Sequence, residues 1–579
     1  MNINNEHTEK PDIISRLFGA AAKHPYLCAL AACLLITPFC YGEYKCIPSY
    51  TKPVTAAFFA AAVTVIVLTL CRKHKLPAVS AVLFSAGGIA ACITAAYYMS
   101  FSKHKIEWFF LSGILLAAGA YAVFFRKELK RQFNVMLIMS SSFLLKYCYV
   151  LGTDIHRRQH DAGNFGTEGI IGGHLGYISY LLREHHLYNG DYREYFQYCH
   201  PPFHHSISAV WVYAVKNVFN VSLDTAFESV QMLTLFYSMA VLISAYYIFR
   251  YFGLDGRPLY ISLAVTAYHP CFTFLSGLVN NDALAWALVM GAVLSTLKWY
   301  RERSLRQIMK ISLCIGLGMM TKVSAALVAP PVAVVFLIAF IKNIRTEWKK
   351  LIGQFAAFGA VCVPLGMWFP VRGYIKWKIP LDHVQALSDE LLQSLKGMDY
   401  FKRITDFSPS QLKRVFENWA YHGENGEVLG MNESNPLIAI LKNSIFSEFI
   451  GGNDLNGSDI LYVCCYVLFW LGVVLAAFAF IAMIWTFVRD NKEDRVQKVF
   501  LGLFYAVLVG NLYVMSAKYT FVCTMNFRYL MPTVITGSLF TGLAVRKNKT
   551  LSIAVSVPAA AFSALSALIY IVTAQNSII

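Results

Sequence analysis

Histidines and charged side chains gather in one polar stretch of this 579-residue chain. Eight of its fifteen histidines lie between Leu151 and Ser206, among Asp, Glu and Arg residues, and long apolar runs precede and follow the stretch. Ionisable groups are costly beside hydrocarbon and persist there mainly for function. Carboxylates, imidazoles and guanidiniums together can accept a proton and bind an anion. We therefore interpret the stretch as a reaction centre where membrane meets water; a solvated polar loop is the alternative.

The elements that must position these groups are membrane-spanning helices. The chain is 57% hydrophobic, 15% aromatic and only 14% charged, with a mean hydropathy of +0.50. Apolar windows of about 18 residues, enough for a helix to cross about 30 Å of hydrocarbon, recur along it. This pattern predicts an all-α polytopic membrane protein of about 15 spans, near 26–42, 54–71, 78–99, 107–125, 134–151, 229–249, 258–276, 281–298, 308–321, 323–341, 351–369, 459–487, 497–516, 527–545 and 551–573.

Short basic loops set the expected topology. Loops rich in Lys and Arg stay in the cytoplasm, and this chain has them near 72–75, 126–131, 250–257, 301–306, 342–350, 489–498 and 546–549. All these loops lie on the same side of the membrane only if the apolar stretch 206–219 does not cross it. At about 14 residues, with Lys216 inside it, this stretch is better read as an interfacial or re-entrant helix. The N-terminus is then cytoplasmic, with no cleavable signal peptide expected.

Two large loops are predicted on the non-cytoplasmic side, over 152–228 and 370–458. The first carries the histidine cluster; the second mixes helix-like pieces with Pro, Gly and aromatic residues. Most cysteines lie in apolar segments, so no disulfide framework is expected. The chemically unusual residues therefore collect on one face of the membrane.

Several short motifs resemble those of one known enzyme superfamily. These are HPPFHH at 200–205, NNDAL at 280–284, MMTK at 319–322, WFPVRGY at 368–374 and FRYLMP at 527–532. Their order and shared side resemble the GT-C membrane glycosyltransferases of the branch that holds family 39-like enzymes, protein O-mannosyltransferases and the lipid A aminoarabinose transferase. The resemblance covers roughly 134–545.

The resemblance implies the following domains: a cytoplasmic N-terminus over 1–25, an added four-helix membrane module over 26–133, a GT-C-like catalytic region over 134–545, and a last helix within 546–579. Outer loop 152–228 would carry active-site residues, and outer loop 370–458 would recognise the acceptor.

The implied reaction is transfer of a sugar from a polyprenyl-phosphate donor to a glycan, lipid or protein acceptor outside the cytoplasm, with inversion. Attack by an acceptor hydroxyl needs a carboxylate to take its proton. The leaving phosphate gains negative charge, so cations aimed at it stabilise the transition state. We expect one essential carboxylate with several cations, contacts with membrane lipids, and no nucleic-acid partner.

Asp161 is the expected general base, because related enzymes carry an acidic residue at this place in their first loop. Asp154 is the alternative. Either residue could instead have a purely structural role, in a loop salt bridge or as a helix cap. Asp282, at the outer end of a span, is the second predicted catalytic carboxylate; it also suits a helix cap.

Further residues are predicted to bind substrate. Lys322, Arg372 and Arg528 each end a predicted span on the outer side, where a lipid phosphate would lie, although snorkelling basic side chains would lie there too. The remaining predicted substrate-binding residues share the same motifs and loops: Arg157, His160, His200, His204, His205, Asn281 and Tyr529. His24, His185 and His186 are predicted to be surface residues.

Three alternatives stay open. A divalent metal is one, with Asp161, Asp282, His160 and His204 as its ligands, because imidazole and carboxylate suit zinc or manganese; no other cofactor is expected. A transporter or flippase of lipid-linked sugars is the second, although no inverted repeat of the kind many transporters have is found. A polymerase or ligase of lipid-linked glycans is the third. The predicted location is the bacterial plasma membrane, or the endoplasmic reticulum in a eukaryote.

Overall fold

The computed structural model describes residues 127–163, 172–220, 222–385, 393–412, 415, 421–422, 428–430, 433–447, 450, 452–455, 457–489 and 494–576, together with 107, 110 and 114. The chain divides into two compact units, Met1–Gly113 and Ile114–Ile579, and every element below belongs to the second. The first four predicted spans lie outside the described residues, apart from the three single positions.

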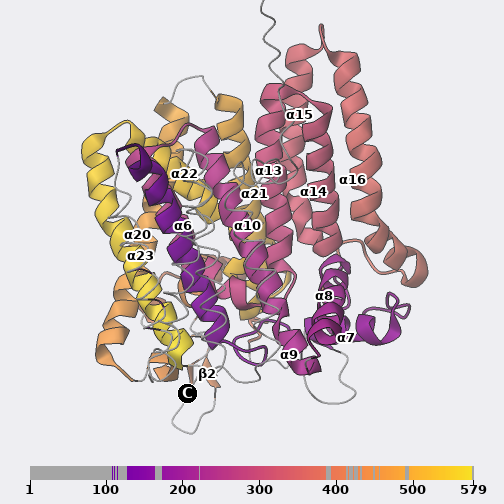
Figure 1. Cartoon of the computed structure of the whole chain (residues 1–579), viewed down its shortest axis with the longest axis horizontal. Coiled ribbons are helices and arrows are strands. Elements are labelled where there is room, and N and C mark those ends of the chain that lie inside the picture. The colour runs from indigo at the N-terminus through magenta and orange to yellow at the C-terminus, as the bar shows by residue number, and fades with distance from the viewer. Residues whose placement is uncertain are drawn as a thin grey trace, which may run out of the picture. The chain divides into compact units, whose positions relative to one another are not determined.

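The described part of the chain is almost entirely helical (Figure 1). Its first half comprises α6 (Lys127–Gly152), α7 (Gly173–Glu184), α8 (Phe203–Phe219), α9 (Leu223–Glu228), α10 (Val230–Tyr251), α11 (Gly256–Tyr268), α12 (Pro270–Phe274), the 3₁₀ turn η1 (Leu275–Gly277), α13 (Asp282–Glu302), α14 (Leu305–Thr321), η2 (Val323–Val328), α15 (Ala329–Asn343) and α16 (Trp348–Trp377). Its second half comprises α17 (Tyr400–Thr405), α18 (Pro409–Leu412), β1 (Tyr421–His422), β2 (Val428–Gly430), α19 (Pro436–Phe446), η3 (Gly452–Leu455), α20 (Asp459–Arg489), α21 (Arg495–Lys518), η4 (Val522–Thr524), η5 (Phe527–Tyr529), α22 (Pro532–Arg546) and α23 (Lys549–Asn576). The strands β1 and β2 form one antiparallel pair.

Seven helices of the described residues are long and apolar enough to cross a membrane, over Leu223–Tyr251, Asp282–Glu302, Val323–Asn343, Trp348–Trp377, Asp459–Val488, Arg495–Lys518 and Lys549–Asn576. Each coincides with a span predicted from the sequence. Helix α8 covers the apolar stretch 206–219 but is not among the seven.

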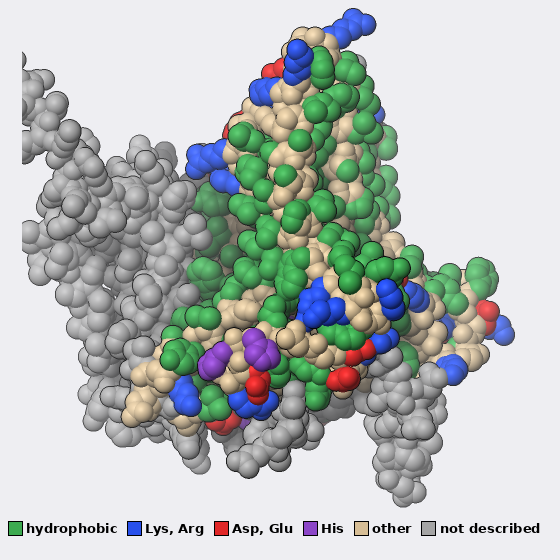
Figure 2. Space-filling view, turned by 90° about the vertical axis from the view of Figure 1, so that its right-hand side faces the viewer, with side chains coloured by type: hydrophobic (Ala, Val, Ile, Leu, Met, Phe, Trp, Pro, Cys, Tyr) green, Lys and Arg blue, Asp and Glu red, His purple; other side chains and the backbone are tan. Residues whose placement is uncertain are grey.

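Apolar side chains cover the outside of these helices. Figure 2 shows a largely apolar surface, with basic side chains near its upper end and charged and histidine side chains near its lower end. On α15 and α16, Leu337, Ile352 and Val363 are all about half exposed. A surface of this composition suits contact with lipid between two aqueous boundaries.

The helices pack as two groups, which contact each other through α10 and are bridged by α21. In one group, α13 packs against α10 and α14, and α14 packs against α16; in the other, α11 and α20 pack against α22 and α23, and α23 against α6. Helix α21 contacts α15 and η2 of the first group and α22 of the second. Helices α7 to α9, together with β2, lie at one end of this arrangement (Figure 1).

The predicted span 258–276 is interrupted by a short non-helical break at His269. The apolar run 258–276 is not a single helix, because α11 ends at Tyr268 and Pro270 starts α12. Proline disfavours helical geometry at the preceding residue, and His269 is accordingly extended. Lys146 Nζ and Ser142 Oγ of α6 donate to the carbonyl of Ala267 at 2.8 and 2.7 Å, which satisfies this end of α11.

Candidate active site

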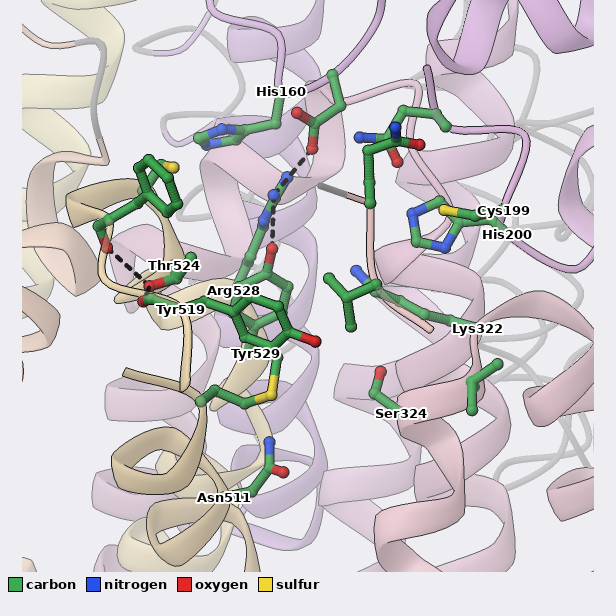
Figure 3. Close-up of a pocket in the computed structure, with 18 of the residues that line it drawn as sticks. His160, Cys199, His200, Lys322, Ser324, Asn511, Tyr519, Thr524, Arg528 and Tyr529 are labelled. Carbon is green, nitrogen blue, oxygen red and sulfur yellow. Dashed lines mark hydrogen bonds and ion pairs between the residues drawn. The ribbon is translucent and has the colours of Figure 1, made fainter. Parts of the chain in front are cut away.

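A cavity of about 450 Å³ lies between η2, α21, η5 and the loops that hold Asp161 and His200. Its polar wall includes side chains of the first predicted outer loop, such as His160, Asp161 and His200, and the cations Lys322 and Arg528 (Figure 3). Its apolar wall comes from η2 and α21, with Val323, Leu327, Leu508, Leu512 and Met515. Residues more than 360 positions apart in the chain thus share one site.

Asp161 is the only carboxylate among the described residues that line the cavity. Its loop is fixed to the start of α7, because the N–H groups of His174 and Leu175 donate to the carbonyls of Asp161 and Ala162 at 2.9 and 3.1 Å. Gly173 makes this contact possible: its φ is +84°, and a Cβ there would lie 2.3 Å from the Ala162 carbonyl oxygen. Asp161 itself has a φ of +60°, a strained backbone of the kind found at functional sites.

Arg528 joins the two predicted catalytic carboxylates. Its Nη2 donates to Asp161 at 2.9 Å and to the hydroxyl of Tyr529, labelled beside it in Figure 3, at 2.8 Å. Its Nε lies 3.8 Å from Asp282 Oδ2. Its backbone is held as firmly, because Arg528 N donates to Asn526 Oδ1 at 3.0 Å and Trp286 Nε1 donates to Arg528 O at 2.8 Å. The guanidinium is therefore presented to the cavity in a fixed position.

Asp282 lies behind the two cations and does not line the cavity. Its side chain is 1% exposed, and Oδ1 accepts a 2.5 Å hydrogen bond from Lys322 Nζ. Lys322 lies just after α14, and its Nζ is 4.8 Å from the ring centre of Tyr529. The structure brings these predicted residues together. Its geometry favours Asp282 as an anchor for Lys322 and Arg528, since Asp282 does not line the cavity.

The electrostatics separate the ionised groups from the neutral ones. Burial raises the pKa of Asp161, but the interactions with Arg528, His160 and Lys322 together outweigh this effect, and the pKa ends below its ordinary value. Burial, with the Arg528 charge, lowers the pKa of His160 to about 3. Burial, with the Lys322 charge, lowers that of His200 to about 3 as well. At neutral pH the site thus holds an ionised carboxylate and uncharged imidazoles.

The remaining predicted residues have supporting contacts. His204 and His205 are fully buried and do not line the cavity. His204 Nε2 contacts the Val279 carbonyl at 3.0 Å, and His205 Nε2 contacts His174 Nδ1 at 2.9 Å. Asn281 Nδ2 donates to the Thr321 carbonyl at 2.8 Å, which ties the start of α13 to the end of α14.

Two predicted cations are not brought to the cavity. Arg372 Nη2 donates to the Tyr188 carbonyl at 2.8 Å and to Asn189 Oδ1 at 2.9 Å, so α16 is fastened to the loop after α7. Arg157 is half exposed and lies 3.7 Å from Asp154, which is itself outside the cavity lining. Their predicted binding roles have no support from this geometry.

The residues suggested as metal ligands do not fit a metal. Among the described residues, no group of three or more His, Cys, Asp or Glu side chains is arranged to bind an ion. Instead, Arg528 lies between Asp161 and Asp282, and His204 faces a backbone carbonyl. A cation supplied by the protein already occupies the position that a metal would need.

Several residues of the cavity wall were not predicted from the sequence. His174, Gln197 and Cys199 of the first outer loop line the cavity, as do Asn511 and Tyr519 of α21 and its end. His174 carried the clearest signal, since it is one of the eight clustered histidines. The others were not distinguishable from ordinary loop and helix residues.

A comparison with protein families bears on this site. Residues 205–368, less than a third of the chain, match the family model of GT-C-type membrane glycosyltransferases that use a polyprenyl-phosphate sugar donor. That family is the dolichyl-phosphate-mannose-protein mannosyltransferases. The match confirms the resemblance found in the sequence. No curated protein matches the chain. The matched residues include Asp282 and Lys322 but not Asp161 or Arg528, whose roles rest on the geometry.

Proposed function

We propose that the protein is an inverting glycosyltransferase that moves a sugar from a polyprenyl-phosphate donor to a hydroxyl acceptor. One observation carries the proposal: the cavity combines a single carboxylate, Asp161, with the cations Lys322 and Arg528 beside an apolar wall. A lipid phosphate with a long hydrocarbon tail has the complementary form. Its phosphate would contact the cations and its tail would follow η2 and α21.

The chemistry follows from these positions. Asp161 accepts the proton of the acceptor hydroxyl, whose oxygen forms a bond to the anomeric carbon. The bond from that carbon to the phosphate oxygen breaks, and the phosphate leaves with a second negative charge. Lys322 and Arg528 stabilise this growing charge. A phosphate leaves without being protonated, so a second acidic carboxyl group, as glycosidases use, is not needed.

The experiment that tests the proposal follows a labelled sugar on its lipid carrier. The purified protein in vesicles is given polyprenyl-phosphate mannose with a radiolabelled sugar and an extract of source-cell membranes as acceptor. We expect the label to move to the extract while free polyprenyl phosphate accumulates. Label that crosses the bilayer still attached to its carrier would identify a flippase. Transfer that lengthens a lipid-linked glycan would identify a polymerase.

The predicted sidedness of the membrane is a separate test. We expect a tag in the basic loop 342–350 to react only from the cytoplasm. A tag beside the exposed residues His185 and His186 should react only from the other side, because basic loops are retained inside. Accessibility to a membrane-impermeant reagent in intact cells measures this. Labelling of both tags from the same side would contradict the proposed topology.

The anchoring role of Asp282 predicts a loss of stability. Asp282→Ala removes the carboxylate that pairs with the buried Lys322, and breaking such a buried pair costs about 3–5 kcal/mol. The midpoint of thermal unfolding in detergent should fall clearly. The control is Asp382→Ala, which breaks the exposed 3.0 Å pair with Lys518; exposed pairs contribute about 1 kcal/mol or less. Equal midpoints for the two variants would remove the anchoring role.

A further inference from the structure

Gln197 is a buried residue of the cavity wall that the mechanism above does not use. Its residue surface is 6% exposed, it lines the cavity, and its Oε1 accepts no hydrogen bond from any residue that the structure describes. Buried polar atoms are nearly always paired, since leaving one unpaired is costly. Because Gln197 belongs to the cavity wall, a ligand in the cavity is the natural source of the donor that its buried amide oxygen lacks.

The side chain of Gln197 is not what holds its own turn. The φ of Gln197 is +70°, where glycine is unstrained and a longer side chain is uncommon. The turn is fixed by its backbone, since Gly173 N donates to Phe196 O at 2.9 Å and His200 N to Gln197 O at 3.3 Å. Tyr198 beside it is completely buried. The amide is therefore presented by a rigid turn without taking part in it.

The histidines that line the cavity with this amide are uncharged. Burial lowers the pKa of His160 and of His200 to about 3, and burial with the His205 interaction lowers that of His174 well below its usual value. The carboxylate of Asp161 is paired with Arg528. A sugar hydroxyl suits this amide, because it brings a hydrogen-bond donor without placing a further charge in a buried site.

We propose that Gln197 is a specificity-determining residue whose amide binds a ring hydroxyl of the donor's sugar and so selects which uncharged sugar is transferred. This inference rests on the proposed glycosyltransferase function. A donor whose sugar lacks this hydroxyl leaves the buried amide oxygen without a hydrogen bond. The missing bond weakens transition-state binding of that donor relative to the correct one.

The test compares wild type with Gln197→Leu on matched donors. The donors are polyprenyl-phosphate mannose, glucose and galactose, followed by the monodeoxy analogues of the best of them. In wild type we expect one deoxy position to lower kcat/KM by about 10-fold or more, as for other lost hydrogen bonds to a buried partner. In Gln197→Leu that same deoxy donor should perform nearly as well as its parent.

A second variant tests the neutrality of the wall. Gln197→Glu keeps the size of the side chain and adds a negative charge, so an amino-sugar donor should improve relative to the parent sugar. The control is Gln307→Leu at the start of α14, where another buried glutamine also has an unpaired Oε1 but lies outside the cavity lining. Its donor preference should equal that of wild type.

These experiments distinguish failure of the proposed Gln197 role from failure of the proposed glycosyltransferase function. If wild type releases no polyprenyl phosphate from any donor, the glycosyltransferase proposal fails. If wild type is active but Gln197→Leu lowers kcat/KM equally for every deoxy donor, Gln197 has only a structural role. Should Gln197→Leu not fold, Gln197→Glu decides, and an unchanged deoxy profile and amino-sugar preference would overturn the inference.

Discussion

The Asp161→Asn enzyme is expected to lose about 100-fold or more of its turnover while it still folds and binds donor. Asparagine keeps the size of the side chain but cannot take the proton of the acceptor hydroxyl, and a general base contributes about 10²- to 10⁴-fold. Steady-state release of polyprenyl phosphate measures the loss, and a thermal shift on adding polyprenyl-phosphate mannose reports donor binding.

The matched control is Asp154→Asn. Asp154 belongs to the same loop but lies outside the cavity lining and pairs with the half-exposed Arg157. Its turnover should stay near that of wild type. Normal turnover in Asp161→Asn, with a loss in Asp154→Asn, would transfer the role of base to Asp154.

The pH dependence follows from the same contact. Because Arg528 holds the pKa of Asp161 below its ordinary value, which is about 3.9 for an aspartate, the carboxylate is ionised throughout the neutral range. The base is lost only when the pH falls through this lowered pKa. We therefore expect kcat/KM to stay level from neutral pH down to about 5, with its acid limb below about 4.

Much of this site could be predicted from the sequence, because hydropathy shows which residues lie at the ends of membrane spans. Lys322 and Arg528 end predicted spans on the same side as the loop of Asp161, and the structure brings all three to one cavity. The same reasoning failed for Arg372, because depth along a helix does not say which face a residue occupies. Helix α16 turns Arg372 towards Tyr188 and Asn189.

Other features depended on local backbone geometry that no periodicity encodes. Gln197 and Asp161 both have positive φ. Glutamine rarely adopts this conformation, and the preference of aspartate for it is too weak to predict it at one position. The break at His269, by contrast, was readable, since Pro270 lies inside the predicted span 258–276 and proline interrupts helices. Hydropathy alone passed over it because Pro270 is flanked by apolar residues.

The Arg528→Lys enzyme tests whether the guanidinium does more than carry charge. Arg528 contacts Asp161 and Tyr529 through Nη2 while its Nε faces Asp282, and the ammonium of lysine cannot reproduce such a fork. We expect a measurable fall in kcat/KM for Arg528→Lys and a larger one for Arg528→Ala. The alanine loss should be about 2–4 kcal/mol of transition-state stabilisation, as for other lost charge-stabilising donors.

The two Arg528 variants should also differ in their pH profiles. Arg528→Ala removes the positive charge that lowers the pKa of Asp161, so that pKa rises and the acid limb of kcat/KM moves to higher pH. Arg528→Lys keeps the charge and should move the limb less. A basic side chain that only reaches the interface to stay hydrated would make lysine equivalent to arginine. Wild-type kinetics and an unmoved acid limb in Arg528→Lys would therefore exclude a specific phosphate contact, and an unmoved limb in Arg528→Ala would separate Arg528 from Asp161 as well.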